Sequence, residues 1–187
     1  MADDMPTALN LPMANPLPAD TQKYFDICME KLGMIPNVLK AYAFDVEKLN
    51  AFTAMYNDLM LGDSALSKLE REMIAVAVSS VNKCFYCLVV HGAAVRHLSG
   101  DPALGEALVM IYKVAKIDPR QRAMLDFAVK LTRESAAVEE ADRETLRDHG
   151  FTDRDIWDIA NVAGFFNMSN RVASAVHLMP NPEYHAA

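Results

Sequence analysis

The sequence has little cysteine: three residues among 187, an odd number. The disulfide framework that holds many small secreted domains together is therefore excluded. Positive charge is also scarce, since 18 Lys and Arg face 25 Asp and Glu, for a formal net charge of −7, and no basic run stands out. This balance argues against a surface for nucleic acids or anionic membranes.

Long apolar runs are missing as well. No stretch approaches the ~20 residues that a membrane-spanning helix needs. The first residues, Met1-Ala2-Asp3-Asp4, lack the basic start and apolar core of a secretory signal. We therefore expect a cytoplasmic protein. In a reducing compartment, a close cysteine pair indicates catalysis, redox sensing or metal binding rather than a structural crosslink.

The alternation of apolar and polar residues that marks strands is absent too, and β-branched residues follow helical spacing instead. With 52% apolar residues, the chain can bury a substantial core. The sequence predicts an all-α fold. Residues 1–19 are expected to form an extended Pro-rich arm, and residues 20–187 a single helical domain. The arm carries four prolines: Pro6, Pro12, Pro16 and Pro18.

Several capping signals place the helices. Apolar residues at three- and four-residue steps predict one long amphipathic helix from Val38 to about Leu61. Ser67 to Glu70 is a capping box, and the helix that it opens is apolar nearly all round, which predicts central burial. Asn82-Lys83 interrupts that helix before the cysteine pair. The last long helix is expected from Ile156 to about Leu178.

A weak internal echo relates residues 67–93 to residues 152–178. Each stretch has a capping signal, an apolar helix and a polar interruption, at Asn82 in the first and from Asn167 to Asn170 in the second. The second stretch lacks cysteine. We therefore expect two weakly similar helical halves within one helical bundle.

The segment Cys84-Phe85-Tyr86-Cys87 begins a predicted helix, and His91 follows one turn later. Free backbone N–H groups and the positive end of the helix dipole favour a thiolate there, which is the reactive form. His91 lies on the same helical face and can exchange a proton with Cys87. The pair could form a sulfenic acid with peroxide, resolve it to a disulfide, and be reduced by thiol exchange.

Other interpretations of the pair remain. Two cysteines on a helix can be small buried apolar residues. Zinc needs four ligands, whereas this face offers two Cys and one His, with His97 off the face and Cys28 far away. Leu88 stands where c-type haem attachment needs histidine, and a thioredoxin-type motif would follow a strand.

Four residues form a spaced pattern: eleven residues separate Glu72 from Cys84, two separate Cys84 from Cys87, and three separate Cys87 from His91. This pattern resembles the alkyl hydroperoxidase D (AhpD)-like branch of the carboxymuconolactone decarboxylase superfamily. The flanking segments 69–72 and 91–92 also look like the family. The stretch Leu32-Gly33-Met34-Ile35-Pro36-Asn37-Val38 looks like its peroxidase-related subgroup. The resemblance extends over about residues 20–180.

The resemblance implies an all-helical, oligomeric protein in which Cys87 attacks peroxide and Cys84 resolves the product. It also implies that Glu72 and His91 form a proton relay that activates Cys87. The helix-dipole argument alone favours Cys84 as the thiol of lower pKa. One residue departs from the family pattern: Tyr86 stands where the pattern has a histidine, so a second proton-transfer group is missing. Glu72 could instead pair with Lys68 or Arg71 at the surface.

We expect a thiol-dependent peroxidase, an oxidoreductase that reduces small hydroperoxides through a Cys84/Cys87 dithiol–disulfide cycle without a bound cofactor or metal. Its expected partners are a small hydroperoxide, a thiol or disulfide reductant and further copies of the chain. Two alternatives are lactone decarboxylation, known in the wider superfamily, and a non-enzymatic redox sensor. The dithiol argues against decarboxylation, because that branch does not depend on a CxxC pair.

Other chemically suggestive residues have structural interpretations. Cys28 lies on a core-facing helix. Asn167, Asn170 and Arg171 interrupt an apolar helix and need polar partners, either at the site or in another subunit. Four large apolar residues are expected in the helical core or in a subunit contact and not in a ligand site: Trp157, Phe165, Phe166 and Met168.

Overall fold

The computed structural model describes residues 5–185, and this part of the chain is helical without any strand. The predicted all-α fold is therefore confirmed. Residues 1–4 of the predicted arm and residues 186–187 of the predicted domain lie outside the described part. The helices are α1 (Ala19–Leu32), α2 (Asn37–Tyr42), α3 (Val46–Leu61), α4 (Lys68–Asn82), α5 (Phe85–Ser99), α6 (Pro102–Ile111), α7 (Pro119–Arg133), α8 (Glu140–Asp148) and α9 (Asp153–Ala175). Short 3₁₀ turns occupy Tyr112–Val114, Ser135–Ala137 and Pro182–His185.

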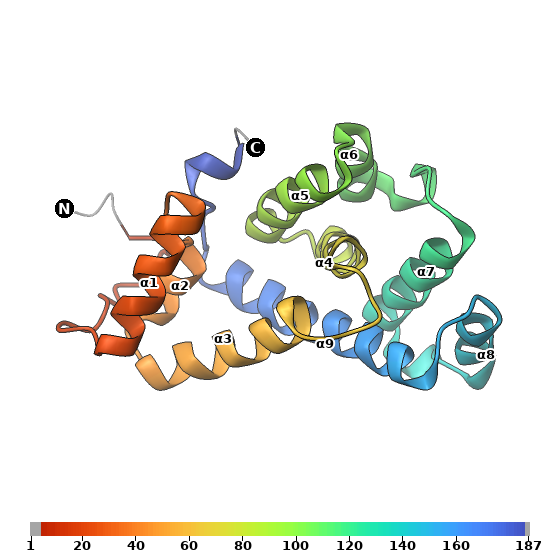
Figure 1. Cartoon of the computed structure of the whole chain (residues 1–187), viewed down its shortest axis with the longest axis horizontal. Helices are drawn as coiled ribbons and strands as arrows, with labels where there is room; N and C mark the ends of the chain where they lie inside the picture. The colour runs from red at the N-terminus through yellow and green to blue at the C-terminus, as the bar shows by residue number, and fades with distance from the viewer. Residues whose placement is uncertain (1–4, 186–187) are drawn as a thin grey trace.

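Helix α4 is the centre of the fold, as its apolar sequence predicts. It contacts α5, α6, α7 and α9, which surround it (Figure 1). The predicted capping box is formed: Glu70 N–H bonds to the Ser67 hydroxyl, and the Glu70 carboxylate accepts from Ser67 N–H. Met73, Ile74 and Val76 are fully buried. The dithiol segment directly after α4 therefore starts from a rigid, buried support.

The predicted helix over residues 38–61 is wrong as a single element. The chain turns between α2 and α3, where the Asp45 side chain caps the new helix by accepting a hydrogen bond from Lys48 N–H at 3.2 Å. This turn lets the rings of Tyr42 and Phe52 stack with centroids 4.5 Å apart. Aromatic stacking and a local N-cap favour two helices over the continuous one that apolar spacing suggests.

The last helix also ends earlier than predicted, at Ala175 instead of about Leu178. His177 adopts a left-handed φ of 52°, and Leu178 N–H returns to the carbonyl of Ala173 at 2.9 Å. This bonding pattern satisfies carbonyls at the helix end without a glycine. As a result, Leu178 folds back onto the cluster that contains Cys84 and Cys87.

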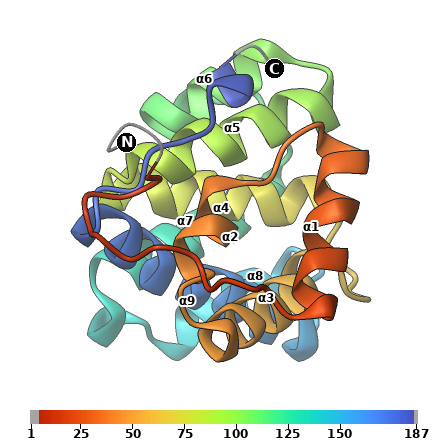
Figure 2. The same cartoon turned by 90° about the vertical axis from the view of Figure 1, so that its left-hand side faces the viewer.

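The described N-terminal residues run beside the C-terminal segment. Ala8 N–H bonds to the carbonyl of Val176, and Met179 N–H bonds to the carbonyl of Pro6, at 2.9 and 3.0 Å. Figure 2 shows the red N-terminal segment running beside the blue C-terminal one at the left of the view. Asn37 N–H also bonds to Asn181 Oδ1 at 2.7 Å. The two chain ends are thus joined over the start of α2.

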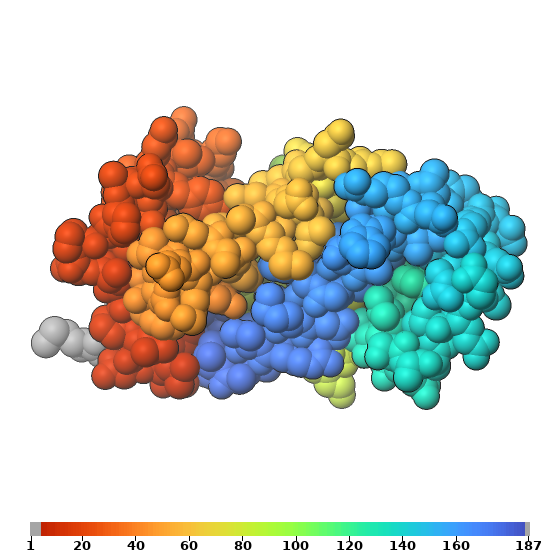
Figure 3. All heavy atoms as spheres, turned by 90° about the horizontal axis from the view of Figure 1, so that it is seen from below, coloured from red at the N-terminus to blue at the C-terminus, as the bar shows by residue number. Residues whose placement is uncertain are grey.

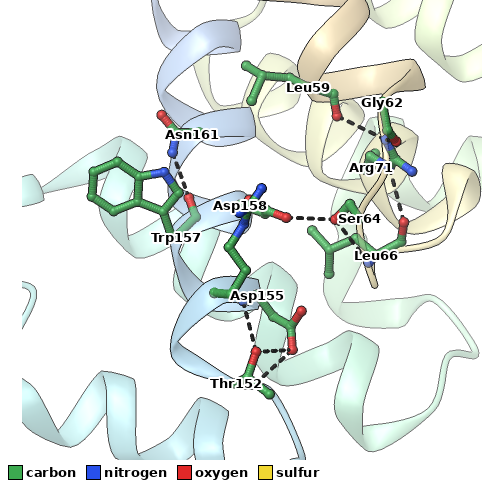
Figure 4. A network of polar contacts seen from close by, with 11 residues as sticks. Leu59, Gly62, Ser64, Leu66, Arg71, Thr152, Asp155, Trp157, Asp158 and Asn161 are labelled. Carbon is green, nitrogen blue, oxygen red and sulfur yellow. Dashed lines mark hydrogen bonds and ion pairs between the residues drawn. The ribbon is translucent and has the colours of Figure 1, made fainter.

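A buried arginine organises the loop between α3 and α4 (Figure 4). Arg71 donates to the carbonyls of Leu66, Leu59 and Gly62 at distances of 2.9 to 3.2 Å. Ser64 in the same loop donates to the Asp158 carboxylate of α9 at 2.7 Å. The face in Figure 3 shows α3 lying along α9, with α1 at one end and α7 and α8 at the other.

Replacing Arg71 with alanine is expected to lower the free energy of unfolding by about 2–4 kcal/mol, because three backbone carbonyls at the end of α3 and in the following loop lose their donor. Urea denaturation measures this loss. Arg143→Ala is the matched control, since Arg143 forms only a surface pair with Glu140, and should cost less than about 1 kcal/mol. Similar losses in both variants would contradict the structural role of Arg71.

Within residues 5–185, no helix combines the length and the apolar character needed to cross a bilayer.

Candidate active site

The four predicted site residues come together where α4 meets α5. Cys84 is the N-cap residue of α5, Cys87 lies in its first turn, and His91 lies one turn further. Glu72 comes from α4. Lys83 joins the helices in a left-handed conformation, with φ of 54°, and Cys84 N–H bonds to the carbonyl of Ser79 at 3.1 Å. This tight connection holds the cysteine pair against α4.

The cysteines are free thiols with their sulfur atoms 2.9 Å apart in hydrogen-bond contact. A disulfide bond is about 2.0 Å long. Only a small side-chain movement is therefore needed for the two sulfurs to bond once an oxidant has removed two electrons from the pair. Each residue is only 1% exposed, so both sulfurs lie beneath the surface.

The pair shares one proton unequally. The pKa of the Cys84 thiol is lowered to about 7, chiefly because the Cys87 thiol donates a hydrogen bond to its sulfur. Cys87 N–H, Ser174 and the charge of His91 act in the same direction, and burial opposes them. The pKa of Cys87 is raised by the same contact with Cys84 and by burial. The resting charge of the reduced pair therefore lies on Cys84.

His91 and Glu72 form a buried pair beside the thiols. The Nδ1 atom of His91 lies 2.6 Å from Glu72 Oε2, and the two side chains are 8% and 12% exposed. A carboxylate can only accept, so Nδ1 carries the hydrogen and Nε2 remains for proton exchange. The His91 ring meets Phe166 edge-on at 4.6 Å. Arg71, the alternative partner of Glu72, donates to backbone carbonyls instead.

Tyr86 is directed to α2. Its hydroxyl oxygen accepts a hydrogen bond from Val38 N–H at 3.3 Å. Burial raises the pKa of Tyr86 well above its ordinary value, so the phenol stays protonated at neutral pH. Tyr86 therefore anchors α2 near the dithiol and cannot act as the second proton acceptor that a histidine would supply.

Apolar residues cover the dithiol. Cys84, Tyr86 and Cys87 share a buried cluster with Ala173 and Leu178, bordered by Val38, Ala41, Val90 and Val176. A hollow of about 310 Å³ lies between α7 and α8, and one of about 240 Å³ between α1 and α3. Neither is lined by the two cysteines. Because both cysteines are 1% exposed beneath this cover, a molecule that reaches the sulfurs must be small or enter through a local opening of the cover.

Two serines near the sulfurs were not identified from the sequence. Ser79 on α4 hydrogen-bonds to Cys87, and Ser174 on α9 hydrogen-bonds to Cys84. Asn170, which the sequence marks as a polar residue in need of partners, also hydrogen-bonds to Cys87. The available signal for Ser79 was its place as a polar residue in an otherwise apolar buried helix.

The remaining candidates lie elsewhere. Cys28 packs in a separate cluster with Phe25 and Leu39. Phe165 and Phe166 belong to the main core, while Trp157 and Met168 are exposed. Among the described residues, no group of three or more His, Cys, Asp or Glu side chains is arranged to hold a metal ion.

Comparison with known proteins places this chain in a family. The sequence model of the Carboxymuconolactone decarboxylase family matches residues 47–103, which include Glu72, both cysteines and His91. A crystal structure of an uncharacterized peroxidase-related protein from Silicibacter sp. TM1040 is 78% identical, with a TM-score of 0.95, over 99% of this chain and 97% of that one. The chain belongs to the AhpD-like branch of the carboxymuconolactone decarboxylase superfamily.

Two further solved structures resemble this AhpD-like chain, one in sequence and fold and the other in fold alone. An uncharacterized peroxidase-related protein from Ralstonia eutropha JMP134, described as an alkylhydroperoxidase AhpD core, is 44% identical. It has a TM-score of 0.92, over 96% of this chain and 94% of that one. The debrominase Bmp8 shares the fold at 17% identity, with a TM-score of 0.80, over 96% and 95%. No functionally curated protein matches the sequence significantly.

The shared proton of the dithiol leads to a testable titration. We expect the ultraviolet thiolate absorbance of the AhpD-like protein to rise with a midpoint near pH 7, the pKa of Cys84. Cys87→Ala should move the midpoint upward, toward the ordinary thiol value, because Cys84 loses its main donor. Cys28→Ser should leave it near 7, since burial raises the pKa of Cys28. An unchanged midpoint in Cys87→Ala would contradict the shared proton.

Proposed function

We propose that the protein is a thiol-dependent peroxidase that reduces small hydroperoxides through a Cys84–Cys87 dithiol–disulfide cycle. The observation that carries this proposal is the reduced pair, with sulfurs 2.9 Å apart and one thiol lowered to a pKa of about 7. Thiolate is the form that attacks peroxides. The buried Glu72–His91 pair supplies a proton donor within the same site.

The first half of the cycle oxidises Cys87. Its proton passes to Cys84 across the 2.9 Å contact, so that the negative charge moves to Cys87. The Cys87 sulfur then attacks the terminal peroxide oxygen: an S–O bond forms and the O–O bond breaks. His91, carrying a second proton on Nε2, gives that proton to the departing alkoxide, which leaves as an alcohol. His91 regains the proton from the dithiol reductant when the disulfide is reduced. Cys87 becomes a sulfenic acid, oxidised by two electrons, and the peroxide is reduced by two.

The second half closes the disulfide and returns the dithiol. The Cys84 sulfur attacks the Cys87 sulfenic sulfur, and the hydroxide that leaves combines with the Cys84 proton as water. A dithiol reductant then attacks the disulfide, passes through a mixed disulfide, and leaves oxidised. The near-contact of the two sulfurs favours this internal resolution over further oxidation of Cys87.

Burial of the site supports a preference for small substrates. Both sulfurs lie under apolar side chains at 1% exposure, so a compact hydroperoxide reaches them with less displacement than a bulky one. A lactone decarboxylase would have no need of the thiol pair. A redox sensor would oxidise slowly and pass its state to a binding partner.

Stopped-flow oxidation of the reduced protein by hydrogen peroxide and by small and bulky organic hydroperoxides tests the proposal. We expect rates well above those of a free thiol, and faster reaction with small hydroperoxides than with bulky ones. A Cys84–Cys87 disulfide should be the product. Rates equal to those of a free thiol would contradict peroxidase activity and favour the sensor.

We also propose that the protein self-associates. Met110, Ile111 and Val114 form an exposed apolar set at the end of α6 and the following turn, each more than half exposed. Water contact with such a set is unfavourable, and burial against another copy would remove it. Sedimentation velocity should show an oligomer at micromolar concentration. A monomer at all concentrations would contradict this proposal.

A further inference from the structure

A chain of three amides leads from the partly exposed Asn167 of α9 through Asn82 to the buried Asn170 beside Cys87, and the direction of its hydrogen bonds follows from its outer partners. Arg171 Nη1 lies 2.8 Å from Asn167 Oδ1, and Asn167 Nδ2 lies 3.0 Å from the carbonyl of Ala163. A guanidinium only donates and a carbonyl only accepts. The amide orientation of Asn167 is therefore determined, with its oxygen turned to Arg171.

The orientation of Asn167 determines the orientations of the Asn82 and Asn170 amides. Asn82 Nδ2 lies 3.1 Å from Asn167 Oδ1 and 2.9 Å from Asn170 Oδ1, so one NH₂ group serves both oxygens. The Asn170 oxygen is thereby occupied by Asn82. Its NH₂ group must face the opposite way, where Nδ2 donates to the Ser79 hydroxyl at 2.9 Å.

Ser79 and Asn170 then face the dithiol as donors. Both residues are fully buried, and both hydrogen-bond to the Cys87 sulfur and lower its pKa. Since the Ser79 oxygen already accepts from Asn170, its hydroxyl hydrogen is free for Cys87. The Cys87 sulfur therefore meets an O–H donor and an N–H donor whose directions are set by distant partners.

We propose that Ser79 and Asn170 form a buried donor pair that stabilises negative charge on Cys87, and that Asn82 and Asn167 position it. The inference rests on the proposed dithiol cycle and deepens it. When Cys84 is protonated or bound in a mixed disulfide, Cys87 must carry the negative charge, and the donor pair stabilises it there. Cys87 holds that charge at the moment of attack on peroxide. It holds it again when a reductant attacks Cys84 and Cys87 leaves as thiolate.

The other titratable groups near Cys87 are unchanged in the variants that test this proposal. On α5, Tyr86 interacts electrostatically with Cys87 and His91 with Cys84, and Glu72 on α4 contacts His91. Cys84 is the one strongly competing titratable group, since it is the main cause of the raised pKa of Cys87. Its removal therefore exposes the effect of the donor pair.

The test uses Cys28→Ser/Cys84→Ala protein, in which Cys87 is the sole thiol, and records thiolate absorbance against pH. A Cys-free protein with Cys87→Ala added provides the baseline. In this background burial raises the pKa of Cys87 and the two donors lower it. The measured pKa is the reference against which the Ser79 variants are compared.

Ser79→Ala in this background should raise the pKa of Cys87 by about one pH unit, and Ser79→Thr, which keeps the hydroxyl, should restore it. Thr132→Val is the matched control: it removes a second partner of Asn167 Nδ2, at 3.0 Å, but leaves the Ala163 carbonyl that sets the orientation. No shift is expected there.

The reciprocal background, Cys28→Ser/Cys87→Ala, separates donor pairing from a general structural effect. Ser79→Ala should change the pKa of Cys84 by much less than that of Cys87. Equal shifts of both thiols, or no shift of Cys87, would overturn the proposal. These titrations involve no peroxide, so a failure of the peroxidase assignment would appear in the stopped-flow rates and not here.

Discussion

Replacement of Cys87 by serine is expected to lower peroxide-dependent turnover by about 100-fold or more. A serine hydroxyl keeps the shape of the side chain but is not ionised near neutral pH, so no thiolate remains at the attacking position. Cys84 would still be present, but it would have lost the thiol that donates to it and the partner that closes the disulfide. A coupled assay with a dithiol reductant measures the loss.

Two companion variants make this result specific. Cys28→Ser should keep turnover within about twofold, because Cys28 lies in a separate apolar cluster. Cys84→Ser should allow Cys87 to reach the sulfenic acid, which a trapping reagent detects by mass spectrometry, but should block the disulfide and repeated turnover. Full turnover by Cys87→Ser would reject the dithiol cycle.

Much of the site could be predicted because its chemistry is local in sequence. Cys84, Cys87 and His91 lie within eight residues on one helix, and helical spacing alone places them on one face. Glu72 required the resemblance to the AhpD-like pattern, since its partner lies on a different helix. The capping box at Ser67 and the break at Asn82-Lys83 then located both helices.

The remaining features depend on contacts between distant segments. The break after Tyr42 reflects a stack on Phe52 and a cap by Asp45, neither of which alters the apolar spacing of residues 38–61. The bonds between Ser79 and Asn170 join α4 to α9 across 91 positions. A serine inside an apolar helix does not reveal which sulfur it will meet. Tyr86 likewise stands in the motif but is directed to α2.

The polar residues that interrupt the two similar stretches, 67–93 and 152–178, hydrogen-bond to each other. Asn82 from the first half hydrogen-bonds to Asn167 and Asn170 from the second. Amides withdrawn from water need partners, and here the buried Asn170 and the half-buried Asn82 and Asn167 hydrogen-bond to one another within the same chain. The arrangement also explains how a core that is otherwise apolar can present oriented donors to a sulfur.

The electrostatics and the family resemblance describe different moments of the proposed cycle. At rest the charge lies on Cys84, whose pKa is lowered to about 7, in agreement with its position at the helix N-terminus. The resemblance implies attack by Cys87. A proton shift over 2.9 Å connects the two states, and the donors at Cys87 lower the cost of that shift. One negative charge that lies on Cys84 at rest and on Cys87 at attack therefore reconciles the two descriptions.

The second large effect is expected at the His91–Glu72 pair. His91→Ala should reduce peroxide turnover by about 100-fold, and Glu72→Gln by about 10-fold or more, within the range of general acid–base catalysis. Glutamine keeps an oxygen that can accept from His91 Nδ1 but removes the charge. Glu144→Gln, an exposed change on α8, is the matched control and should have no effect.

The double variant decides whether the two residues act as a unit. If Glu72 works through its 2.6 Å contact with His91, Glu72→Gln should cost nothing further once His91 is alanine, because residues that act together lose activity non-additively. The Cys84–Cys87 disulfide should still form under excess peroxide, only more slowly. Fully additive losses in the double variant would mean that Glu72 does not act through His91, and would remove the proton relay from the mechanism while leaving the dithiol in place.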